Sequence, residues 1–139
     1  MNKLTVKAQI MAPLAVVWTK WNNEDDITKW CFASPDWCCP RASNDLRVGG
    51  TLNSRMEAKD GSMGFDFEGV YTEVTLLKSI AYKLGDKREV HITFTEDNGL
   101  TTVTETFDPE NENPLEMQQA GWQAIMDNFK AHVLASMAL

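Results

Sequence analysis

The sequence is poor in basic residues and in long apolar runs, and each shortage excludes a class of protein. Its 13 lysines and arginines face 20 aspartates and glutamates, which gives a formal net charge of −7. Because contacts to phosphate need clustered lysine and arginine, we expect no nucleic-acid partner. No stretch approaches the roughly 20 apolar residues that a membrane-spanning helix requires, so we expect no membrane span.

Cysteine is also scarce and odd in number, with only Cys31, Cys38 and Cys39. An odd count fits a reducing compartment, and no apolar signal segment follows the N-terminal Met-Asn-Lys, so we expect a cytoplasmic protein. The three thiols lack a fourth ligand at metal-site spacing, which predicts no metal site. The chain also lacks a nucleophile elbow and a phosphate-binding glycine loop. We therefore predict no cofactor and assign no catalytic residue.

The pattern that is present predicts one domain over residues 1–139, the usual length of a domain. Residues 2–10 alternate between apolar and polar side chains, as a half-buried strand does. Pro13 opens a short helix, and Asn23 is placed to cap a second one. Asn113 and Pro114 then predict the start of a long helix that runs to about residue 137.

Between these helices the chain reads as strands separated by tight turns. Asp60-Gly61 and Asn98-Gly99 are strong hairpin signals, because these residues accept a positive φ. Tight hairpins make neighbouring strands antiparallel, which predicts a meander of six to seven strands and an α+β fold. The expected strands after the two short helices are 41–47, 51–59, 63–74, 79–84, 88–97 and 100–107.

Side-chain parity predicts where the sheet and the long helix meet. Large residues on the helix form one stripe, from Trp122 and Ile125 to Val133, and small residues such as Gly121 lie beside it. The pattern fits either a plain core or a cavity between helix and sheet. Four tryptophans within residues 18–37 are hard to bury fully, and this favours a pocket.

Glu105 shares the parity of Val103 and Phe107, which predicts an inward carboxyl group. A buried carboxylate needs a partner, or its pKa rises. The group can hydrogen-bond a ligand or act as a general base. It can equally pair with an arginine or lysine, or reach solvent at a strand end.

Several segments together resemble the START-like (SRPBCC) superfamily, in the branch named for the activator of heat-shock protein 90 ATPase. They are PLAVVWTKW at 13–21, DWCCPRASNDLRVGG at 36–50, DGSMGFDFEGVYTEV at 60–74 and TVTETFDPENENPLEMQQAGWQAIMDNF at 102–129. The resemblance implies a helix-grip fold, a curved antiparallel sheet around the long helix, with a deep apolar cavity. One departure is Cys38, where similar proteins tend to carry histidine, and it puts proton transfer at that position in doubt.

The combined interpretation is a carrier or sensor of a small apolar molecule. An enzyme with Glu105 as base and a chaperone-directed interaction module are the alternatives, and a homodimer stays open. The candidate ligand-binding residues are Trp30, Phe32, Trp37, Met56, Phe65, Phe67, Tyr82, Phe94, Glu105, Gly121, Trp122 and Ile125.

Overall fold

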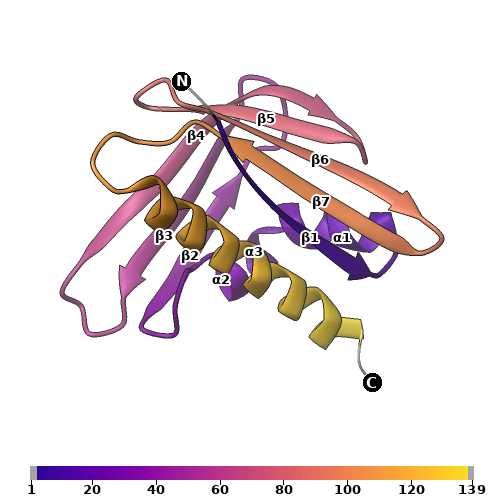
Figure 1. The fold of residues 1–139 in the computed structure, drawn as a ribbon, viewed down its shortest axis with the longest axis horizontal. Coiled ribbons are helices and arrows are strands. Elements are labelled where there is room, and N and C mark those ends of the chain that lie inside the picture. The colour runs from indigo at the N-terminus through magenta and orange to yellow at the C-terminus, as the bar shows by residue number, and fades with distance from the viewer. Residues whose placement is uncertain (1–2, 138–139) are drawn as a thin grey trace.

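The computed structural model describes residues 3–137 and shows a curled antiparallel sheet with a long helix across its hollow side (Figure 1). The helices are α1 (Leu14–Asn22), α2 (Glu24–Trp30) and α3 (Leu115–Met137). The strands are β1 (Leu4–Met11), β2 (Trp37–Asn44), β3 (Thr51–Ala58), β4 (Gly64–Thr75), β5 (Ser79–Leu84), β6 (Glu89–Asp97) and β7 (Leu100–Phe107). The predicted α+β fold with two short helices and a long final one is confirmed.

The strands form one seven-stranded sheet in the order β1-β7-β6-β5-β4-β3-β2. Strands β2 to β7 follow one another as the predicted meander, and β1 pairs antiparallel with β7 at the far end. The hairpin between β6 and β7 turns at Asn98 and Gly99, with φ of 53° and 83°. Both values are positive, as a type I′ turn requires.

Strand β2 differs from the prediction, because it starts at Trp37 and ends at Asn44 instead of spanning 41–47. Trp37 and Cys38 pair with the end of β3, and the register then shifts before Arg41. Pro40 lies in this irregularity, since proline cannot donate to a strand ladder and is tolerated at a bulge on an edge strand. The proline divides the strand locally, and pairing with β3 holds its two parts together.

Of the two helix caps predicted at asparagines, the one at Asn23 is present and the one at Asn113 is not. The side chain of Asn23 caps α2 as expected, since its Oδ1 accepts from the amides of Asp25 at 3.0 Å and Asp26 at 3.2 Å. Asn113 instead donates through Nδ2 to Glu110 Oε2 at 2.9 Å. The helix begins at Leu115, one residue after the predicted start, and the Pro114 carbonyl accepts its first hydrogen bonds.

Helix α3 is packed tightly over only part of its length. Met126, Phe129 and Val133 in its second half are fully buried, and the Phe129 ring lies 4.8 Å from Trp21 and 5.0 Å from Trp30. Trp122 and Ile125, in the first half of the same predicted stripe, are only partly buried. The first half of α3 therefore leaves space between itself and the sheet.

The outer edge of β1 is covered by glutamine side chains of α3. Gln119 Nε2 donates to the Thr5 carbonyl at 2.6 Å. Gln123 Nε2 donates to the Lys7 carbonyl at 3.0 Å, and its Oε1 accepts from the Lys7 amide at 3.3 Å. An uncovered edge strand invites pairing with another chain, and here the helix satisfies these backbone groups. Of the helices within residues 3–137, none is long and apolar enough to cross a membrane.

Candidate functional site

A pocket of about 240 Å³ lies under the first half of α3, between the helix, the inner face of the sheet and the short helices. Most of its wall is apolar. The aromatic part comprises Trp21, Trp30, Phe65, Phe67, Tyr71, Tyr82 and Trp122, and the aliphatic part comprises Ile27, Leu52, Met56 and Ile125. The polar part comprises Asn22, Cys31, Asn44, Ser54, Arg88 and Glu105.

Strand parity and the gap under α3 together place these side chains. Leu52, Ser54 and Met56 alternate along β3 and so point to one face of the sheet. Trp122 forms the roof, stacked on Phe107 with ring centroids 3.8 Å apart and planes 9° apart. Its indole also meets the edge of Phe67, with ring centroids 5.9 Å apart.

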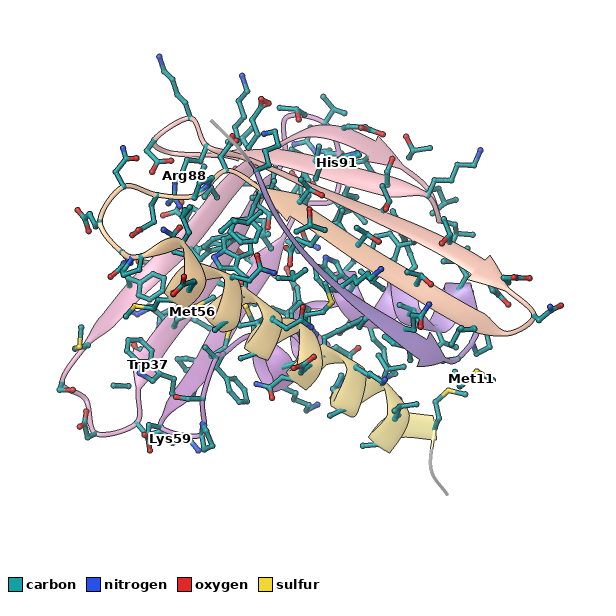
Figure 2. The ribbon with its side chains drawn as sticks, viewed as in Figure 1. Met11, Trp37, Met56, Lys59, Arg88 and His91 are labelled. Atoms are coloured by element: carbon teal, nitrogen blue, oxygen red, sulfur yellow. The ribbon has the colours of Figure 1, made fainter. Side chains whose placement is uncertain are left out.

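The start of α3 lies between Met56 and Arg88 in the side-chain view (Figure 2). Both residues belong to the pocket wall, Met56 from β3 and Arg88 from the turn before β6. Phe65 is 47% exposed and also belongs to the wall, which places it where the pocket meets the surface. Arg88 is held away from the interior by Asp86, whose Oδ2 accepts from Nε at 2.7 Å.

Glu105 occupies the middle of the apolar inner face. On β7 it is paired with Val6 of β1 on one side and Ile92 of β6 on the other, and both neighbours are fully buried. Glu105 itself is 6% exposed. Burial raises the pKa of its carboxyl group to about 8, because the charged form loses water without gaining a partner. No side chain or backbone group within residues 3–137 donates a hydrogen bond to it.

The buried thiol of Cys31 lies near this carboxyl group, and the buried thiol of Cys39 lies next to that of Cys31. Cys31, in the pocket wall, has its pKa raised by a hydrogen bond with Cys39 and by burial, and the charge of Glu105 adds to the effect. The same hydrogen bond lowers the pKa of Cys39. At neutral pH the thiol of Cys31 therefore stays protonated, and this makes it a poor nucleophile.

Three other residues of the wall, Tyr71, Asn44 and Asn22, are already hydrogen-bonded to one another. The Tyr71 hydroxyl donates to Asn44 Oδ1 at 2.6 Å, and Asn44 Nδ2 donates to the Asn22 carbonyl at 2.8 Å. Burial raises the pKa of Tyr82 well above its usual range. Glu105 is the acidic side chain of the wall, and burial is the cause of its raised pKa.

Most of the residues proposed from the sequence meet at this pocket: Trp30, Met56, Phe65, Phe67, Tyr82, Glu105, Trp122 and Ile125. The structure places four others outside its wall. Phe94 packs deeper, with its ring 5.1 Å from that of Trp18, and Trp37 lies behind Phe65 at 6.0 Å. Phe32 packs against the core from the side, and Gly121 faces open space.

Several wall residues are not among the candidates from the sequence, although strand parity alone places them on the inner face. Ser54 lies two residues from Met56 on β3, and Tyr71 lies on the same face of β4 as Phe65 and Phe67. Trp21, which is not among the candidate residues from the sequence, also reaches the pocket. In the described part of the chain no group of three or more His, Cys, Asp or Glu residues is arranged to hold a metal ion.

The comparison with known families matches residues 11–133 to the family described as activator of Hsp90 ATPase homolog 1-like protein. The chain belongs to this family. The match covers most of the sequence and places the chain in the activator-like branch of the START-like (SRPBCC) superfamily. A START-like module of this family binds a ligand or a protein partner.

Solved structures agree with this assignment. The chain is 43% identical to the AHSA1-like protein from Aeromonas hydrophila, with a TM-score of 0.91, over 97% of this chain and 94% of that one. It is 48% identical to Chr148 from Cytophaga hutchinsonii, with a TM-score of 0.84, over 99% and 95% of the two chains.

A more distant relative shares the fold alone. The Aha1 dimer from Colwellia psychrerythraea is 15% identical, with a TM-score of 0.72, and 96% of each chain is covered. The comparison with curated proteins gave no match.

Proposed function

We propose that the protein binds one small apolar molecule in the pocket under the first half of α3 and acts as a carrier or sensor. The observation that carries the proposal is the incomplete packing of α3. In its second half the inward side chains Met126, Phe129 and Val133 are fully buried. In its first half Trp122 and Ile125 stand over a space of about 240 Å³ with a mainly aromatic wall. Concave, mainly apolar sites with a few polar groups are typical of small-molecule binding.

The size of the space limits the ligand. A water molecule takes up about 30 Å³ in the liquid, so 240 Å³ corresponds to the volume of several waters. A molecule with one or two fused rings is of a suitable size for this space. Phe65, which is exposed at the surface end of the pocket, marks the place where such a molecule would enter.

A binding role is better supported than catalysis. Glu105 is a candidate base with a pKa of about 8. A reaction also needs groups that stabilise charge as it develops, and the nearby Tyr71 hydroxyl and Asn44 amide are bonded to each other. The enzyme hypothesis therefore rests on Glu105 as its one assigned group.

The test is a titration with a neutral naphthalene probe, followed by probe fluorescence and by isothermal calorimetry. We expect saturable binding at about one probe per chain. Ile125→Trp places a larger side chain in the pocket wall and should weaken binding by at least about tenfold. Leu134→Trp adds the same side chain at an exposed position of α3, and should leave the affinity unchanged. Equal affinities of the two variants would show that the probe binds elsewhere.

A protein-interaction role is the alternative that the family description favours, since it refers to activation of a chaperone ATPase. The Colwellia relative is described as a dimer, which also makes a homodimer of this chain a candidate. A chaperone contact would appear as a change in Hsp90 ATPase rate on addition of the protein. Sedimentation at several concentrations would distinguish a monomer from a homodimer. We also propose that the protein is located in the cytoplasm.

A further inference from the structure

The buried carboxyl group in the pocket points to a more specific class of ligand. From the geometry of the pocket, and resting on the proposed function, we propose that the ligand is an aromatic or apolar amine whose ammonium group binds beside Glu105.

The first argument is the position of Glu105. Its carboxyl group is part of the pocket wall, it is 6% exposed, and it lies between the apolar side chains of Val6 and Ile92. Among residues 3–137 no donor is bonded to it. A ligand is therefore the group that can compensate the carboxylate, and it would do so from within the pocket.

The second argument compares glutamate with its neutral analogue. A glutamine at this position would offer a ligand both a donor and an acceptor without the cost of burying an ionisable group. What glutamate adds is a negative charge. A neutral donor recovers only part of the cost of burying that charge, and a charge-assisted hydrogen bond from an ammonium group recovers more of it.

The third argument is the rest of the wall. Aromatic ring faces attract cations by their quadrupole, and the wall holds aromatic side chains from five elements: Trp21, Trp30, Phe67, Tyr71, Tyr82 and Trp122. The formal net charge of −7 also attracts cations in general. Arg88, the basic residue of the wall, is bound to Asp86 and does not reach the carboxyl group as a partner.

Within residues 3–137, none of the other titratable groups around Glu105 carries a positive charge that could take the place of a ligand's ammonium group beside the carboxylate. Tyr82 of β5, Tyr71 of β4 and Cys31 after α2 all have raised pKa values, so they stay neutral near pH 7. Cys39 of β2 has a lowered pKa and is bonded to Cys31 and to the Arg41 carbonyl. The residues that α3 contributes to the wall, Trp122 and Ile125, carry no charge.

The test compares two probes of the same shape, naphthylmethylamine, which is an ammonium ion at pH 7, and naphthylmethanol, which is neutral. We expect the amine to bind at least about tenfold more tightly than the alcohol at pH 7.5. Glu105 must release its proton to the buffer when the ammonium binds. The affinity for the amine should therefore rise about tenfold from pH 6.5 to pH 7.5, and the affinity for the alcohol should not change.

Three controls make the result specific. Calorimetry in buffers of different ionisation enthalpy should show that the wild-type protein releases up to about one proton when the amine binds. Glu105→Gln should remove the preference for the amine and keep the alcohol binding. Glu68→Gln removes the same charge from an exposed position of β4, and should keep the preference.

The outcomes separate this inference from the proposed function. If both probes bind equally, or if Glu105→Gln still prefers the amine, the amine proposal is wrong and the pocket still binds apolar molecules. If neither probe binds, both proposals fail. The pH dependence and the proton release are measured on the wild-type protein, so the test does not depend on how well the variants fold.

Discussion

A carboxyl group in the middle of an apolar sheet face makes the stability of the protein depend on pH. Burial raises the pKa of Glu105 from 4.5 to about 8. The folded protein therefore holds this proton over a range in which the unfolded chain has released it. Below pH 4.5 both states are protonated and the group has no effect, and the cost of the buried carboxyl grows as the pH rises to about 8.

We expect Glu105→Gln to remove this pH-dependent cost. The variant should unfold with nearly the wild-type free energy at pH 5 and should be more stable at pH 8.5, by roughly 2–4 kcal/mol. Urea unfolding of both proteins at the two pH values measures the difference, and effects of other titrating groups cancel between them. If the two proteins differed in unfolding free energy by the same amount at both pH values, the Glu105 carboxylate would have a partner within the folded protein.

The inward position of Glu105 follows from the sequence, because alternation along a strand fixes which side chains share a face. The absence of a partner does not follow, because that depends on which residues of distant strands and helices surround it. Trp37 shows the same limit. Its position beside Phe65 depends on the pairing of β2 with β3. That pairing is not predicted from the local sequence, because Pro40 argues against a strand at this point.

At the level of elements, α3 has two halves with different functions. The second half fixes the helix to the core through Met126, Phe129 and Val133, all fully buried. The first half forms the roof of the pocket through Trp122 and Ile125. A helix anchored at one half can leave a space under the other half without losing its position on the sheet.

We expect two truncations on α3 to separate these functions. Phe129→Ala should cost about 3–5 kcal/mol of unfolding free energy, since it opens a cavity in a closely packed cluster of rings. Trp122→Ala should cost less, about 1–3 kcal/mol, because the indole is partly exposed and already borders a space. The same variant should weaken binding of the neutral naphthalene probe, because stacking on the roof is lost.

Chemical denaturation of both variants, with Leu134→Ala as an exposed control on the same helix, measures these costs. A larger loss for Trp122→Ala than for Phe129→Ala would mean that the first half of α3, and not the second, anchors the helix. The amphipathic stripe on α3 is visible in the sequence. The division of the stripe into an anchoring and a roofing half is not, because it depends on how far the sheet curls away from the helix.

For the whole molecule, a ligand in the pocket links the helix to the sheet and should stabilise the native state. A probe at about 100 times its dissociation constant adds about 2.7 kcal/mol of stability. For a chain of this length we expect the melting temperature to rise by roughly 8–10 °C. Calorimetric or fluorescence melts with and without the neutral naphthalene probe measure the shift, and Ile125→Trp should show a much smaller one. A probe that binds but leaves the melting temperature unchanged would have no preference for the folded state.

The pairing of β1 with β7 has a consequence for the order in which the chain folds during synthesis. The hydrogen bond from Thr101 Oγ1 to the Ala12 carbonyl, 2.7 Å long, joins residues 89 positions apart. At roughly 5–20 residues per second, the ribosome needs several seconds to deliver the partner of β1 after β1 itself has emerged. Strands β2 to β6 can pair in succession during that interval, while the apolar side chains of β1 remain without their partner strand. We expect β1 to be accessible to a ribosome-associated chaperone in a nascent chain stalled before residue 100. In a chain released after α3 has been made, β1 should be paired with β7 and inaccessible.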